Sequence, residues 1–168
     1  MYRIPARYSC SMIRKLVDKV INGISVPPAE GENTEAREHA LRLATAVLMI
    51  DVARSDHSFD ETEFDRILEL VRIHFNLSTE DTADLIVEAH ERSEESVSAY
   101  DFTRLLTDNL DHHEKSRIVS LLWQVAFADG ELDKYEDSYV LKISDLLHVS
   151  RARVMRLKHD AGKTARTG

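Results

Sequence analysis

The stretch VLMIDVARSDHSFDETEFDRILELV at residues 47–71 aligns without a gap with SLLWQVAFADGELDKYEDSYVLKIS at residues 120–144. The constant shift is 73 residues, and three acids recur at the same offsets: Asp56/Asp129, Asp60/Asp133 and Glu63/Glu136. In each copy an apolar helical pattern precedes the acids and another follows them. The sequence therefore predicts a duplicated helix–acidic turn–helix unit.

Helical periodicity extends outward from this repeat in both directions. Apolar residues recur at helical spacing in segments at about 9–22 and 34–53, and in segments that begin near residues 60, 78, 98, 111, 133 and 150. No segment alternates with a period of two, and only five Gly and three Pro interrupt the 168 residues. We expect an all-α fold, a compact bundle of about seven to eight helices with an internal pseudo-two-fold repeat.

The predicted organisation has three parts. Residues 1–33 form a basic amphipathic helix and a linker, residues 34–161 form the helical domain, and residues 162–168 form a flexible tail. The leading helix could lie on a membrane surface or dock on a partner, but it has no Trp or Phe anchor. Packing of this helix against the domain is the favoured interpretation.

Composition and charge restrict the class of protein. Cys10 is the single cysteine, so no internal disulfide can form, and no apolar run is long enough to span a bilayer. We find no signal peptide and expect a cytoplasmic protein. The net charge is −8, and residues 28–136 carry 26 acids against ten Lys/Arg, which disfavours nucleic acid as a partner. A cation or a basic protein partner suits this acidic middle, although solvated helix faces explain most of its charge.

Helix capping accounts for four of the six repeated acids. Asp60 with Glu63, and Asp133 with Glu136, have the spacing of a capping box, which contributes about 1 kcal/mol to helix stability. Asp56 and Asp129 are expected to end the preceding helix, where a negative charge opposes the helix dipole. Their repetition is the feature of the sequence that favours a bound cation.

The segment Asp129-Gly130-Glu131-Leu132-Asp133-Lys134-Tyr135-Glu136 resembles the second half of an EF-hand loop. The first half lacks its ligands, which excludes a true EF-hand. Hard oxygen ligands favour Ca²⁺, Mg²⁺ or Mn²⁺. The predicted metal ligands are the repeated acids Asp56, Asp60, Glu63, Asp129, Asp133 and Glu136.

The repeats VARSDHSFDETE and VAFADGELDKYE, each following an apolar helix, resemble the TerB-like domain associated with tellurite resistance. The resemblance covers roughly residues 36–161. It implies a helical bundle with pseudo-two-fold symmetry, acidic residues that bind metal, and a role in cytoplasmic or membrane-associated stress-response complexes. The first copy has His57 where the second has Gly130, so a turn that needs a positive φ would be strained there.

No catalytic constellation stands out. His112 and His113 point in different directions on a helix, and Asp111 with Glu114 fits a capping box. Trp123 is expected in the core. We therefore expect a non-enzymatic module that binds a divalent cation or a protein partner, with homodimerisation left open. The alternatives are an interaction scaffold with purely structural acidic caps, or a metal-dependent hydrolase.

Overall fold

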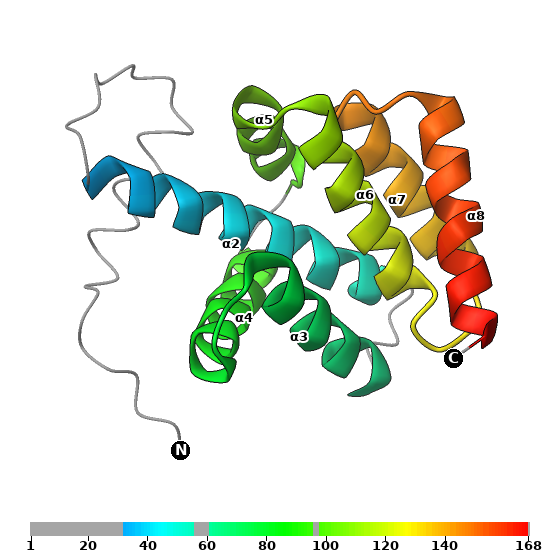
Figure 1. Ribbon diagram of the computed structural model, residues 1–168, viewed down its shortest axis with the longest axis horizontal. Helices are drawn as coiled ribbons and strands as arrows, with labels where there is room; N and C mark the ends of the chain where they lie inside the picture. The colour runs from blue at the N-terminus through cyan, green and yellow to red at the C-terminus, as the bar shows by residue number, and fades with distance from the viewer. Residues whose placement is uncertain (1–31, 56–60, 96–97, 168) are drawn as a thin grey trace.

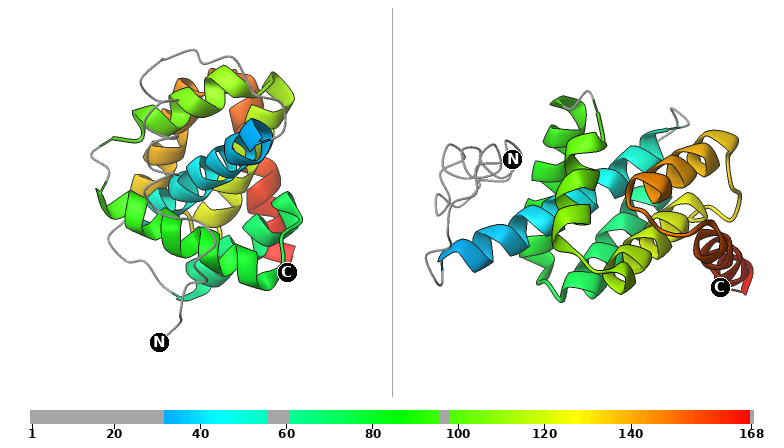
Figure 2. Two further views of the ribbon diagram at one scale, coloured as in Figure 1. Left: turned by 90° about the vertical axis from the view of Figure 1, so that its left-hand side faces the viewer. Right: turned by 90° about the horizontal axis from the view of Figure 1, so that it is seen from above.

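A computed structural model describes residues 32–55, 61–95 and 98–167, and every regular element in these ranges is a helix. The seven helices are α2 (Glu32–Arg54), α3 (Glu61–Phe75), α4 (Thr79–Glu95), α5 (Tyr100–Asn109), α6 (His112–Ala126), α7 (Lys134–Leu146) and α8 (Arg151–Thr167). Figure 1 shows them gathered into one bundle, and the two further views in Figure 2 show the same packing. The predicted all-α class is confirmed.

Two central helices, α2 and α6, organise the bundle. Residues 43–50 of α2 are all buried, so this helix has no solvent-facing side over two turns. It packs against α3, α4, α5, α6 and α7, and α6 packs against α2, α3, α7 and α8. Trp123 in α6 is fully buried, as expected from the sequence. The core thus lies along α2 and α6, with the other helices around them.

The first residues of α4, α5 and α6 agree with the helix-start signals in the sequence. Ser78 caps α4 by accepting a 3.0 Å hydrogen bond from Asp81 N, and Ser98 accepts a 3.1 Å bond from Tyr100 N at α5. Asp111 and Glu114 form the predicted capping box at α6. Local hydrogen bonds therefore explain where these helices begin.

Two hydrogen bonds between the copies fall at matching positions of the alignment. Tyr139 Oη on α7 donates to Asp51 Oδ2 on α2 over 3.0 Å, and Arg66 Nη2 on α3 donates to Gln124 Oε1 on α6 over 3.2 Å. Both Asp51/Gln124 and Arg66/Tyr139 are related by the 73-residue shift. In each case the second helix of one copy reaches the first helix of the other. The pseudo-two-fold symmetry of the whole bundle stays a prediction.

The C-terminal segment differs from the sequence prediction, which treated residues 162–168 as a flexible tail. Helix α8 continues to Thr167, so residues 162–167 are helical. Gly162 lies under the Phe127 ring, where an added Cβ would meet ring carbon Cζ at 3.2 Å. This close approach gives the last turns of α8 a surface to pack on. The predicted N-terminal helix and linker fall outside the described residues, apart from the start of α2.

Candidate functional site at the acidic turns

The second acidic turn joins α6 to α7 through a tight backbone path. Ala128 N donates to Val125 O over 2.9 Å, and Gly130 N donates to Phe127 O over 3.0 Å. Gly130 has φ of +89°, in the left-handed region that a residue without Cβ adopts readily. The conformation of the turn therefore favours glycine at this position.

Asp133 and Glu136 form the predicted capping box at the start of α7. Asp133 Oδ1 accepts a 2.7 Å hydrogen bond from Tyr135 N, and Glu136 Oε2 accepts a 3.2 Å bond from Asp133 N. Glu136 is only 3% exposed. Both carboxylates therefore satisfy backbone amides that the first turn of a helix leaves without partners.

Asp129 also supports the turn. Its Oδ1 accepts a 2.9 Å hydrogen bond from Glu131 N. Helix α6 ends at Ala126, so this exposed carboxylate lies three residues beyond the helix and not on its last turn. Aspartate is favoured in turns because its short side chain can accept a hydrogen bond from the backbone two residues on. This hydrogen bond is therefore a structural reason for an aspartate at position 129.

The first acidic turn is described only in part. Asp56, His57 and Asp60 lie outside the described residues. Glu63 lies in the first turn of α3 and is 5% exposed, much like its repeat counterpart Glu136. Within the described ranges no group of three or more His, Cys, Asp or Glu side chains is arranged to hold a metal ion. The six-residue ligand set stays a prediction.

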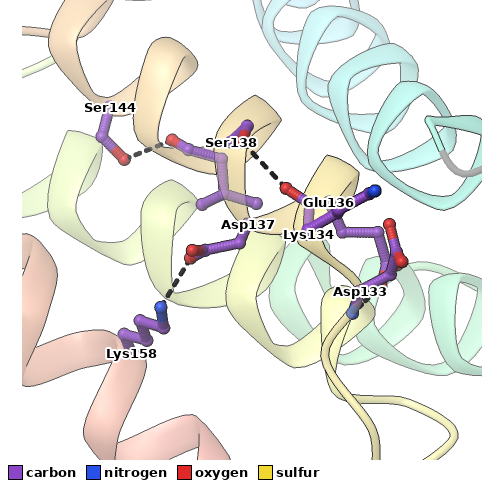
Figure 3. A network of polar contacts seen from close by, with 8 residues as sticks. Asp133, Lys134, Glu136, Asp137, Ser138, Ser144 and Lys158 are labelled. Carbon is purple, nitrogen blue, oxygen red and sulfur yellow. Dashed lines mark hydrogen bonds and ion pairs between the residues drawn. The ribbon is translucent and has the colours of Figure 1, made fainter.

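Next to the capping box, a half-buried cation, the ammonium of Lys158, links α7 to α8. Figure 3 shows Asp137 pointing towards Lys158, and the Nζ–Oδ1 distance is 2.6 Å. The same ammonium lies 5.2 Å from the centre of the Trp123 ring, a cation–π geometry. The Trp123 Nε1 atom is buried and has no hydrogen-bond partner in the described part of the chain. Through the ion pair with Asp137 on α7 and the contact with Trp123 on α6, Lys158 holds α8 against both helices.

A polar cluster near the end of α2 was missed by the sequence reasoning. Asp51 accepts hydrogen bonds from the hydroxyls of Ser93 on α4 and Tyr139 on α7, and so connects three helices. Burial raises the pKa of the Asp51 carboxyl above its usual value, opposed by the hydrogen bonds from Ser93 and Tyr139 and by the Arg54 charge. Burial and the neighbouring Asp51 carboxylate raise the pKa of the Tyr139 hydroxyl. The available signal was one acid inside the apolar run of residues 46–53.

The paired histidines do not form a site of their own. His112 and His113 are both exposed at the start of α6. Asp111 N donates to Glu114 Oε2 over 2.8 Å within the capping box. Hydrogen bonds from the backbone amides of Glu114 and His113 lower the pKa of the Asp111 carboxyl. This segment is a helix start.

These features define a class of protein: over the described residues it is an all-helical bundle in which the two copies of a sequence repeat contact each other. The family described as "Tellurite resistance protein TerB" matches residues 42–159, most of the chain. The chain belongs to the TerB family. Comparisons with curated proteins and with solved structures find no match. Among the helices that the structure describes, none has the length and apolar character to cross a membrane.

Proposed function

We propose that this TerB-family chain is a non-enzymatic binding module that acts through protein contacts in a stress-response assembly of the tellurite-resistance type. One observation carries the proposal. In the described turn, Asp129, Asp133 and Glu136 each accept a hydrogen bond from a nearby backbone amide. Carboxylates used in this way stabilise the bundle, and they need neither a metal nor a substrate to account for their presence.

Thermal unfolding of metal-stripped protein tests the structural role of these acids. Asp133→Ala and Glu136→Ala are expected to lower the melting temperature equally with and without Ca²⁺, Mg²⁺ or Mn²⁺, because the lost interaction is with the backbone. Glu131→Ala is the matched control, since this exposed acid contributes only its backbone amide to the turn. If the cations raise the melting temperature of the wild type, and the substitutions abolish that rise, the turns are ligand sites and the proposal fails.

Divalent cation binding is the second candidate, and one feature of the turn favours it. Asp129 uses Oδ1 to hold the turn, and its other oxygen has no hydrogen-bond partner in the described part of the chain. A hard cation such as Ca²⁺, Mg²⁺ or Mn²⁺ suits an exposed carboxylate oxygen. Calorimetric titration of the wild type and of the Asp56→Ala/Asp129→Ala variant tests this candidate. Heat that is lost in the variant would support it, and equal traces would exclude it.

Crosslinking in cells exposed to tellurite tests the protein contacts. The exposed lysines Lys142 and Lys163 lie on different helices and can report contacts over two surfaces. We expect links from these lysines to other chains under exposure. If every link joins two residues of one chain, the interaction role is wrong.

A further inference from the structure

The outer helices α4 and α8 carry opposite charge. Helix α4 has seven acids and one arginine, whereas α8 has six Lys/Arg and one aspartate. Both helices are 17 residues long. They lie on different parts of the bundle: α4 packs on α2 and α3, and α8 packs on α6 and α7 (Figure 1).

The exposed face of α4 is an acidic stripe with an apolar residue at its centre. Val87 is 53% exposed, although the buried residues of this helix include Leu85 and Ile86. Residues three or four apart lie on one face of a helix. The stripe defined by this spacing consists of exposed residues only, namely Glu80, Asp84, Val87, Glu91 and Glu94.

The exposed face of α8 is the basic counterpart of this stripe. Val154, Leu157 and Ala161 are buried towards the bundle, and Met155 is 39% exposed. At helical spacing around Met155, the exposed residues are Arg151, Met155, His159, Lys163 and Arg166. Like the α4 stripe, it combines charges of one sign with a large apolar side chain.

We infer that α8 of one copy of this chain docks on α4 of a second copy. The two stripes are opposite in charge, lie on helices of equal length, and each presents an exposed apolar side chain, Val87 on α4 and Met155 on α8. Because each copy would use a different helix on each side, the contact is heterologous and extends head to tail into chains or rings. The inference rests on α4 and α8 and is independent of the proposed role of the acidic turns.

The chemistry of the contact sets its strength and its dependence on salt. Exposed ion pairs each contribute little, so several must act together with burial of Val87 and Met155. Charges at exposed positions are screened over about 10 Å at 0.1 M salt. We therefore expect association that appears at high protein concentration and low ionic strength and is lost as salt is added.

Sedimentation velocity of the full chain tests the inference directly. The wild type should sediment above its monomer mass of 19.2 kDa at low salt, increasingly so with concentration, and return to 19.2 kDa at high salt. One variant neutralises the α8 stripe (Arg151→Gln, Lys163→Gln, Arg166→Gln), and a second neutralises the α4 stripe (Glu80→Gln, Asp84→Asn, Glu91→Gln). Each should be monomeric alone, because each keeps only one of the two surfaces.

Mixing the two variants gives the sharpest outcome. The first keeps an intact α4 stripe and the second an intact α8 stripe, so an equimolar mixture should form a two-chain complex that cannot grow further. The matched control, Arg72→Gln/Arg104→Gln/Arg117→Gln, removes three exposed cations from other helices and should associate like the wild type. Circular dichroism verifies that all variants are folded.

Three results would overturn the inference. The first is a wild type that is monomeric at all concentrations at low salt, and the second is association that both stripe variants retain. The third is a monomer that binds phosphatidylcholine–phosphatidylserine vesicles or DNA through the α8 stripe, which would assign this face to a membrane or to nucleic acid instead of to a second copy.

Discussion

Replacing Tyr139 with phenylalanine removes one hydroxyl from the contact that joins the two copies. This hydroxyl donates to Asp51 Oδ2 over 3.0 Å, across 88 residues of sequence. A hydrogen bond to a charged group contributes about 1.5–3 kcal/mol. In the variant, Ser93 still donates to the other oxygen of Asp51, and the cluster is only half-buried. The loss of stability should therefore be smaller than the upper end of this range. We expect Tyr139→Phe to lower the free energy of unfolding by about 1–2 kcal/mol.

Urea unfolding at neutral pH measures this loss, and the melting temperature should fall by about 2–8 °C for a chain of this size. Tyr135→Phe is the matched control, because Tyr135 lies in the same helix but is 54% exposed. Its free energy of unfolding should stay within about 0.5 kcal/mol of the wild type.

A double-mutant cycle with Asp51→Ala separates the hydrogen bond from other effects of the substitution. If the two side chains interact as described, the coupling energy should be about 1 kcal/mol. Effects of the two single substitutions that add without coupling, or a Tyr139→Phe variant as stable as Tyr135→Phe, would refute the reasoning.

Three further outcomes follow from particular side chains. Gly130→Ala, at φ of +89°, should lower the free energy of unfolding by about 1 kcal/mol in urea titrations, and no loss would contradict the strained geometry. The pKa of the Asp51 carboxyl is raised in the folded protein, so its contribution to stability is lost as pH rises from 3.8 through the folded pKa. Asp51→Asn should remove this loss when the free energy of unfolding is measured across that range. The same pH dependence in the wild type and in Asp51→Asn would contradict this prediction. Burial and the Arg117 charge lower the pKa of His74, so stability falls as pH drops below 6.5, and His74→Gln should be less sensitive over that interval; an unchanged slope would exclude this origin.

Features that depend on residues close together in the chain could be predicted from the sequence. The capping boxes at Asp111 and Asp133 are visible in the sequence because both partners lie within four positions, and the helix starts follow from them. The family was also predictable from the repeats VARSDHSFDETE and VAFADGELDKYE, and its model matches residues 42–159, which include both. The fold class could be read from helical periodicity alone.

Contacts between distant segments could not be read in this way. The sequence marks Asp51 as an unusual acid in an apolar run, but nothing in its vicinity identifies Tyr139 as its partner. The extended α8 was missed for a similar reason, since Gly162 suggests a helix end until the Phe127 ring is found packed against it. The role of Asp129 was obscured because the sequence suggests that this residue ends the preceding helix, whereas α6 ends three residues earlier, at Ala126.

The complete burial of residues 43–50 in α2 has a consequence for how the chain folds. Helices from both copies cover this segment, so α2 would expose a continuous apolar surface if either copy opened alone. The duplicated halves should therefore melt together in one cooperative transition, and the amides of α2 should exchange with solvent only through global unfolding. Although the sequence carries two copies of one unit, we expect the helices of both copies to unfold as a single cooperative unit. A fragment that ends after α4 should therefore not fold on its own.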